Sequence, residues 1–258
     1  MYDALDGGAA AEALGFPELR SALLSRARGR TLETAVGTGL NLPLYPGNEG
    51  SVSSLTAVDV SRGMLERARA RAAGVGTAVA QQATFVEGDV ARLPFESDSF
   101  DTGERMALVL LVFFLSMHTR GHPSLLRAAP YYETAPSTLQ APSCPAPSHD
   151  PLSPLSAPAV LDTFSLCVFP DPSAALREMG RVLQPFGSLL LLEHSRSDNP
   201  LLASYQDLTS GAVAATAKGC VWNQDVEGMV RAAGMEVVNA RRAAAGTVVL
   251  LEARKRPA

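Results

Sequence analysis

Residues 31–39, with the sequence Thr-Leu-Glu-Thr-Ala-Val-Gly-Thr-Gly, decide the fold. Residues 31–36 have the pattern of a short strand, and this strand runs directly into Gly37-Thr38-Gly39. Glycines at a strand end let the backbone approach a ligand where a Cβ atom would clash. The carboxyl edge of a first strand is also where open α/β sheets bind nucleotides. The stretch therefore predicts an α/β fold with a ligand-binding turn, although a Gly-x-Gly pair alone also fits a simple tight turn.

Strand and helix patterns alternate outward from this turn, which is typical of a mostly parallel sheet. Ser61 is a suitable N-cap for the helix after the second strand, and Gly234 is a suitable C-cap near the end of the chain. Residues 188–192 are almost continuously apolar, as in a strand buried on both faces. The last two strands are joined by a short link and could form an antiparallel hairpin at the sheet edge. The patterns predict helices over 9–30 (one or two), 61–73, 173–183 and 223–233, and further strands over 54–58, 84–87, 236–238 and 247–251.

Residues 103–159 interrupt this alternation within what is otherwise one domain, 1–258. The segment holds nine of the chain's 18 prolines, and such a composition predicts disorder because it buries too little apolar surface to offset the entropy of ordering. Joining its flanks restores one continuous fourth strand. Codons at both ends can encode a splice donor and a splice acceptor in the same phase, so we interpret the segment as a translated retained intron. A genuine proline-rich surface loop is the alternative, and sequencing the transcript separates the two.

Three acidic residues follow three successive predicted strands. Glu33 lies four residues before the first glycine, where a carboxylate suits the cationic end of a ligand better than a pyrophosphate. Asp59 ends the second strand, where it could accept hydrogen bonds from both hydroxyls of a ribose or simply charge the start of the next helix. Asp89 lies in Gly88-Asp89-Val90, which could hold the amino group of an adenine or form a common turn. Three carboxylates on three strand ends together favour a nucleoside-like ligand with a cationic group.

Several stretches of the chain resemble the class I methyltransferases that use S-adenosylmethionine. Within this class they are similar to the ubiquinone and menaquinone C-methyltransferase-like branch with the type 11 methyltransferase domain. Residues 218–225, Lys-Gly-Cys-Val-Trp-Asn-Gln-Asp, are similar to methyltransferase-like proteins related to the thiol methyltransferases. The resemblance implies a Rossmann-like, seven-stranded, mostly parallel sheet with helices on both faces and an antiparallel edge strand. The other stretches that carry it are 33–46, 58–72, 85–101 and 169–197.

The resemblance also implies S-adenosylmethionine as the cofactor and assigns residues to it by position. The acidic residue and glycines of the first turn would line the methionine part, Asp59 would hold the ribose, and Asp89 with Val90 would hold the adenine. Met64 could pack on the adenine face or in the core, and residues 163–166 would border the sulfonium and the acceptor. The predicted cofactor-binding residues are Glu33, Gly37, Thr38, Gly39, Asp59, Val60, Met64, Gly88, Asp89, Val90 and Thr163.

The predicted function is methyl transfer to a small, rather apolar acceptor such as a thiol, a quinone precursor or a lipid-like molecule. Transfer to a thiolate or a stabilised carbanion needs little base catalysis, so no catalytic residue is assigned. His194 could contact the acceptor or be structural, and Cys220 with Trp222 could form a lid or a buried pair. The alternative is an inactive relative whose fourth strand is split by the insert. Leu42, in place of a third glycine, argues against a nicotinamide-dependent oxidoreductase.

Composition argues against several other classes. The net charge of −4 and the lack of a basic stripe argue against a nucleic-acid partner. The three cysteines and four histidines are scattered, so we predict neither a disulfide framework nor a metal site, and we expect Cys167 in the core. The N-terminus lacks a secretory signal, and the apolar run 106–116 is shorter than the ~20 residues that span a bilayer. We expect an intracellular protein, cytoplasmic or organellar, with peripheral membrane contact and oligomeric state left open.

Overall fold

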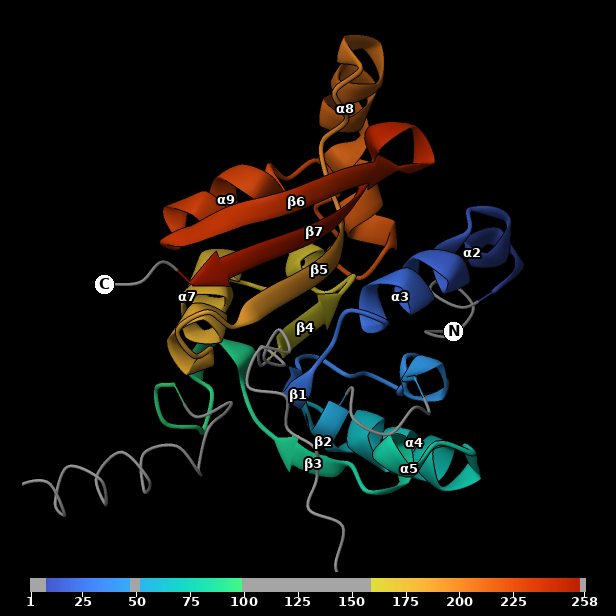
Figure 1. Ribbon diagram of the computed structural model, residues 1–258. Helices are drawn as coiled ribbons and strands as arrows, with labels where there is room; N and C mark the ends of the chain where they lie inside the picture. Colours follow the sequence, from blue (N-terminus) through green and yellow to red (C-terminus); the bar gives the residue numbers. More distant parts are fainter. Residues whose placement is uncertain (1–7, 47–51, 99–158, 256–258) are drawn as a thin grey trace, which may run out of the picture. The chain divides into compact units, whose positions relative to one another are not determined.

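A seven-stranded sheet forms the centre of the chain (Figure 1). The computed structural model describes residues 8–46, 52–98 and 159–255. The strand order is β3-β2-β1-β4-β5-β7-β6; the first five strands pair in parallel, and β7 pairs antiparallel with both β5 and β6. The predicted Rossmann-like fold is confirmed, with β7 as the inner strand of the hairpin at the edge. The strands are β1 (Gly29–Glu33), β2 (Val52–Asp59), β3 (Thr84–Glu87), β4 (Ala159–Thr163), β5 (Ser188–His194), β6 (Met235–Ala243) and β7 (Val248–Lys255).

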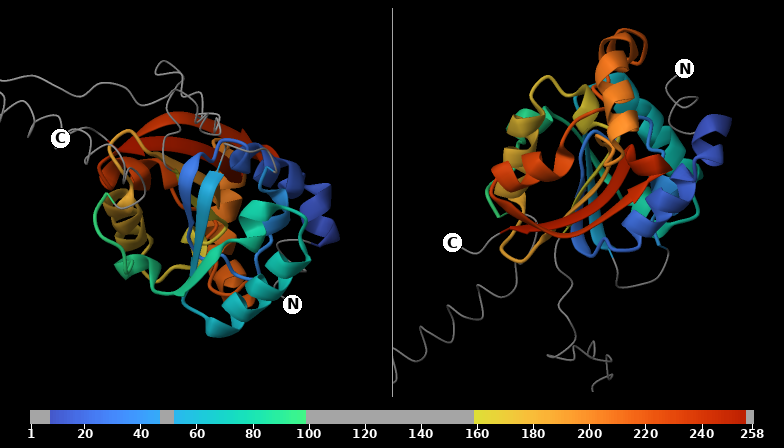
Figure 2. Two further views of the ribbon diagram at one scale, coloured as in Figure 1. Left: turned by 60° about the horizontal axis from the view of Figure 1, so that its bottom comes forward. Right: turned by 90° about the horizontal axis from the view of Figure 1, so that it is seen from above.

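Helices cover both faces of the sheet (Figure 2). On one face α2 (Ala9–Ala13), α3 (Phe16–Leu24), α4 (Arg62–Gly74) and α5 (Ala78–Gln81) share an apolar core with the strands. On the other face α7 (Pro172–Val182) and α9 (Val226–Ala232) do the same. The long helix α8 (Pro200–Thr216) lies beyond the carboxyl end of β5 (Figure 1). Four short 3₁₀ turns complete the described chain: η1 (Leu42–Leu44), η2 (Val90–Arg92), η3 (Leu166–Val168) and η4 (Ala244–Gly246).

The alternating side chains of β5 explain why the sheet is covered on both faces. Leu190 and Leu192 belong to the core beneath α3 and α4, whereas Leu189 and Leu191 belong to the core beneath α7 and α9. Successive side chains of a strand point to opposite faces, so a continuous apolar run needs a cover on each side. Each fully buried leucine contributes about 1.5–3 kcal/mol by leaving water. The apolar pattern of residues 188–192 therefore predicted this central position correctly.

Strand β4 is complete in the described residues. Residues Ala159–Leu161 pair with Thr31–Glu33 of β1, and Ala159–Thr163 pair with Ser188–Leu192 of β5. Ala159, the last residue of the predicted insert, is fully buried in this strand. Nothing in the described residues supports a split fourth strand. The rest of the insert prediction, residues 103–158, lies outside the described residues.

Local signals set several element boundaries. The Ser61 hydroxyl caps α4 by accepting a hydrogen bond from the Met64 amide (3.4 Å), and Gly234 follows α9 with φ +85°. The first strand ends at Glu33 rather than at residue 36, because Ala35 already bends the backbone with φ +47°. Helix α8 was not predicted, since it buries just Ala203 and Gln206 and so lacks an apolar stripe facing the core.

Candidate functional site

The two glycines of the turn after β1 serve different purposes. Gly37 (φ +57°) has open space where a Cβ atom would lie, with the nearest atom, the Ala35 carbonyl oxygen, 3.9 Å away. A Cβ atom on Gly39 (φ +80°) would lie 2.5 Å from Leu42 Cδ1 and 3.3 Å from Ala68 Cα. Gly39 therefore lets the turn pack against α4, whereas Gly37 leaves backbone accessible to a ligand. Thr38, between them, is buried.

Glu33 is a buried carboxyl beneath this turn, with 2% of its surface exposed. The Tyr45 hydroxyl donates to Glu33 Oε2 (2.8 Å), and Asn41 Nδ2 donates to Glu33 Oε1 (3.0 Å). Burial raises the Glu33 pKa to about 7, although these two hydrogen bonds and the charge of Arg20 oppose the rise. Near neutral pH the carboxyl therefore ionises readily when a further positive charge approaches. This environment suits the cationic end of a ligand.

Arg20 joins this network and was not predicted as a site residue. Its Nη1 donates to Asn41 Oδ1 and to Thr163 Oγ1, both at 2.8 Å. Asn41 Nδ2 also donates to Thr163 Oγ1 (3.1 Å), so Thr163 at the end of β4 is linked to Glu33 at the end of β1. Arg20 lies on α3, where the apolar spacing predicted a helix but carried no sign that an arginine would turn inward.

Asp59 ties the glycine turn to the start of α4. Its Oδ2 accepts from the Gly37 amide and its Oδ1 from the Ser61 amide, both at 2.8 Å. The carboxyl is 7% exposed. Each carboxylate oxygen has two lone pairs, so both can still accept a further hydrogen bond such as one from a ribose hydroxyl. The contact with Ser61 also fits the alternative role at the helix start, and the two roles are compatible.

The remaining predicted residues lie along the same edge of the sheet but differ in exposure. Asp89 is exposed, and its Oδ1 accepts from the Ala91 amide (2.9 Å), so it caps η2 while staying open to solvent. Val90 is buried and packs in the core on the α7 side, and its predicted place beside an adenine stays a prediction. Val60 is 71% exposed, and Met64 and Gly88 are half-buried. The predicted cofactor residues therefore lie along one edge of the sheet, and Val90 packs in the core at that edge.

Two buried carboxyls fix the end of β4 against its neighbours. The Thr34 hydroxyl donates to Asp162 Oδ1 (2.7 Å), the Ser165 hydroxyl donates to Asp162 Oδ2, and the Ser165 amide donates to Glu193 Oε1 (3.2 Å). Burial raises the Asp162 pKa to about 6, and burial together with Asp162 raises the Glu193 pKa well above its usual range. The pair therefore holds a proton at neutral pH, which avoids two adjacent buried charges.

Phe164 lies at the same edge of the sheet, directly after β4, and was predicted only within the range 163–166, which the family resemblance placed beside the sulfonium and the acceptor. It has φ +55°, an uncommon conformation for a bulky residue, and it directly follows Thr163. Its ring stacks on Phe16 (centroids 4.8 Å apart) and lies 5.0 Å from the ring of His194. The Arg20 guanidinium lies 5.1 Å from the centre of the same ring. The aromatic cluster therefore joins the end of β4 to the end of β5.

Cys167, His194 and Cys220 come together beside this cluster. His194 Nδ1 lies 3.6 Å from Cys167 Sγ and 3.5 Å from Cys220 Sγ. Both cysteines are reduced and buried, so the expectation that Cys167 is a core residue holds. A hydrogen bond with Cys220 and burial raise the pKa of the Cys167 thiol well above its usual range. The predicted scatter does not hold for these three residues, because the fold brings η3, the end of β5 and the loop after α8 together. Cys144 and the other three histidines lie outside the described residues.

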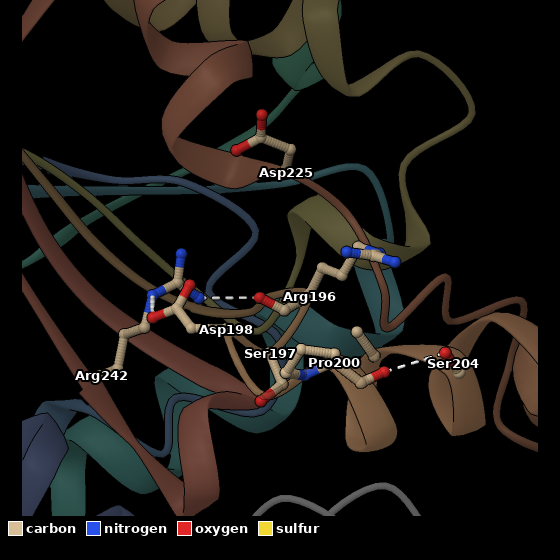
Figure 3. Close-up of a pocket in the computed structure, with 8 residues that line it drawn as sticks. Arg196, Ser197, Asp198, Pro200, Ser204, Asp225 and Arg242 are labelled. Carbon is tan, nitrogen blue, oxygen red and sulfur yellow. Dashed lines mark hydrogen bonds and ion pairs between the residues drawn. The ribbon is translucent and has the colours of Figure 1, made fainter.

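A separate pocket of about 490 Å³ lies beyond β5, near the start of α8 (Figure 3). Its arginines already have partners: Arg242 binds Asp198 (2.8 Å) and the Arg196 carbonyl oxygen (2.8 Å), and Arg196 binds Asp207 (2.8 Å). The pocket includes none of the predicted cofactor residues. The candidate site is therefore the strand-end edge around Gly37, not this pocket.

Part of the chain is similar to known methyltransferases. Residues 31–114 match the family model described as "Methyltransferase domain". Methyltransferase OMS1, mitochondrial, of Saccharomyces cerevisiae is 24% identical over 92% of this chain and 40% of its own length. Phosphatidylethanolamine N-methyltransferase of Cereibacter sphaeroides is 38% identical over 37% of this chain and 45% of its own length. This chain thus spans less than half of each curated relative.

A solved structure shares the fold. An O-methyltransferase family protein from Burkholderia thailandensis superposes with a TM-score of 0.57 at 15% identity, over 98% of this chain and 59% of that chain. At this identity the likeness concerns the fold. Among the residues that the structure describes, no helix is long and apolar enough to cross a membrane.

Proposed function

We propose that this chain, which carries a class I methyltransferase domain, transfers a methyl group from S-adenosylmethionine to a small, apolar acceptor. One observation carries the proposal: an accessible glycine turn with a buried carboxyl beneath it and two further carboxylates on the next strand ends, within a chain matching the methyltransferase family. The names of both curated relatives support methyl transfer as the reaction class.

The residues of the edge fit such a cofactor. Gly37 leaves room for its methionine part, and Glu33 offers a carboxyl poised to ionise near an ammonium group. Asp59 keeps lone pairs for ribose hydroxyls, and the exposed Asp89 can accept from an adenine amino group. When bound, S-adenosylmethionine supplies a methyl group that is already activated on its sulfonium. The chain's main task is then to hold the acceptor in line with that group and to exclude water.

The acceptor is proposed to be a thiol, a quinone precursor or a lipid-like molecule. Phe16, Phe164 and His194 make a largely apolar wall beside Thr163, which suits an apolar acceptor better than a highly charged one. The relative that acts on phosphatidylethanolamine supports the lipid-like class. We assign no general base, since transfer to a thiolate or a stabilised carbanion needs little base catalysis.

Methyl-labelled S-adenosylmethionine tests the reaction directly. The purified chain would be incubated with three acceptor panels: small thiols, hydroxylated quinone precursors, and vesicles containing phosphatidylethanolamine. We expect label in the organic extract of one panel, together with release of S-adenosylhomocysteine, and loss of both with Asp59→Ala. Absence of label in every panel from a chain that binds S-adenosylhomocysteine would instead indicate a binding module.

A further inference from the structure

We propose that Cys167, His194 and Cys220 form a binding site for Zn²⁺ or a similar thiophilic divalent ion. The two thiol sulfurs and the histidine Nδ1 lie within 4.8 Å of one another. Thiolates and imidazoles are the ligands that zinc prefers in proteins. The cysteines and the histidine do not have the spacing of a zinc motif, because the histidine lies 27 residues from one cysteine and 26 from the other.

The two sulfur–nitrogen distances match a tetrahedral ion. With Zn–S bonds of about 2.3 Å and Zn–N bonds of about 2.0–2.1 Å, adjacent sulfur and nitrogen ligands of a tetrahedral zinc lie about 3.5 Å apart. The two observed Nδ1–Sγ distances are 3.6 Å and 3.5 Å. A thiol hydrogen bond also has this length, but Nδ1 has one lone pair and can accept well from one thiol at a time. A shared ion would place both sulfurs at this distance from one nitrogen, whereas in the metal-free chain the Cys167 thiol also has the Phe164 carbonyl oxygen as an acceptor (3.9 Å).

Three separate elements hold the ligands in place. Cys167 lies in η3 after β4, His194 is the last residue of β5, and Cys220 lies in the loop after α8. The Val221 amide donates to the Cys167 carbonyl oxygen (2.8 Å), and the Cys220 amide donates to the Ala217 carbonyl oxygen (2.9 Å). These backbone bonds fasten the loop of Cys220 to the turn of Cys167. The ligand positions are therefore set by the fold before an ion binds.

The surroundings also suit a metal site. Cys167 is 3% exposed and Cys220 is 7% exposed, while His194 is half-buried, so an ion could enter from the His194 side. Three protein ligands leave a fourth position, which zinc sites of this kind give to water or to a substrate atom. If the proposed function holds, this position lies next to the acceptor, because the His194 ring is 5.0 Å from the Phe164 ring.

Cobalt substitution tests the site on the full chain. The protein would be stripped of metal with a chelator in the presence of a reductant and titrated with Co²⁺, whose bands report thiolate ligands and tetrahedral geometry. We expect one Co²⁺ per chain with a thiolate charge-transfer band, and displacement by Zn²⁺. Cys220→Ser and His194→Ala should each weaken binding by at least about 100-fold. Cys144→Ser is the matched control and should leave the band unchanged, since Cys144 is the one cysteine of the chain that is not among the three proposed ligands.

The result can overturn the proposal in three ways. A folded chain that shows no thiolate band, or a band that survives Cys220→Ser, contradicts the site. Thiols at 167 and 220 that resist alkylation until a reductant is added would show a disulfide in place of the metal. Should His194→Ala fail to fold, Cys167→Ser provides a second ligand variant, and its circular dichroism without metal should equal that of the unaltered chain. Cofactor binding is measured separately, so its failure would not be mistaken for failure of the metal site.

Discussion

Individual residues at the end of β1 carry the argument for a cationic, nucleoside-like ligand. Glu33 was predicted from its position before the glycines. The environment of its carboxyl is set by Asn41, Tyr45 and Arg20, and no sequence motif predicted these three residues. A side chain that turns inward from a helix depends on tertiary packing, and local spacing does not encode that packing. The glycines, in contrast, follow from local backbone geometry, and the carboxylates could be predicted from their positions at the strand ends.

Affinity for S-adenosylhomocysteine should depend on pH through Glu33. Its pKa of about 7 means that the free protein holds a proton there at lower pH, and binding of an ammonium group must release it. Affinity should therefore rise by up to about tenfold per pH unit from pH ~5.5 and level off above pH ~7. Titration calorimetry across this range measures the effect. Glu33→Gln should bind more weakly at pH ~8 and lose the pH dependence; a flat profile for the unaltered chain would refute the role of Glu33.

The two glycines of the turn should respond differently to alanine. Gly39→Ala forces a Cβ atom to within 2.5 Å of Leu42, so it should destabilise the fold by about 1–3 kcal/mol. Gly37→Ala meets open space and should cost roughly 1 kcal/mol through its positive φ alone. Because the added methyl group occupies ligand space, Gly37→Ala should nevertheless weaken cofactor binding by tenfold or more. Thermal melts and calorimetry give both numbers, and equal loss of stability in the two variants would argue against the distinction.

Helices and strands with one apolar face could be predicted from local sequence patterns, whereas a helix without such a face could not. Residues 84–87 and the helix after Ser61 agree closely with β3 and α4, because alternation and capping are local signals. Helix α8 is held instead by polar contacts, among them the Arg196–Asp207 ion pair and the hydrogen bonds of Gln206. Gln206 is fully buried; it accepts from the Ser197 amide (2.7 Å) and donates to the Ser195 and Trp222 carbonyl oxygens (3.0 and 2.9 Å). Asn199 and Pro200 at its start were the available signals.

Replacing Gln206 should destabilise helix α8. Gln206→Ala leaves three backbone groups without their partner, two of them buried and one half-buried, so it should lower the free energy of unfolding by about 2–4 kcal/mol. Leu208→Ala on the same helix is the control, since Leu208 is 85% exposed and should change stability by less than about 0.5 kcal/mol. Denaturant unfolding compares the two. Similar losses for both variants would mean that Gln206 does not anchor the helix.

At the scale of the whole molecule, the described residues supply every strand of the seven-stranded sheet. All seven strands pair within the described residues, and β4 pairs with β1 and β5 from Ala159 onward. The fold could be predicted because strand and helix alternation repeats along the chain. The cluster of Cys167, His194 and Cys220 could not, since it arises where distant strand ends converge.

Deletion of residues 103–158 should therefore leave the fold and its ligand site intact. We expect the shortened chain to melt no lower than the full chain and to bind S-adenosylhomocysteine with an affinity within threefold of it. Differential scanning calorimetry and ligand titration measure both. A shortened chain that fails to fold would show that the segment contributes to the sheet, contrary to its interpretation as an insert.

The most direct test of the central claim is calorimetric titration of S-adenosylhomocysteine into the purified full chain, into Asp59→Asn and into Glu66→Gln. Glu66 is the control because it makes an exposed ion pair with Arg62 on the same helix that Asp59 precedes. The account predicts one site per chain, unchanged affinity for Glu66→Gln, and affinity at least fivefold weaker for Asp59→Asn, a loss of ~1 kcal/mol or more. Absence of binding to the folded chain, or equal affinity for Asp59→Asn, would contradict the claim that this strand-end edge is the cofactor site.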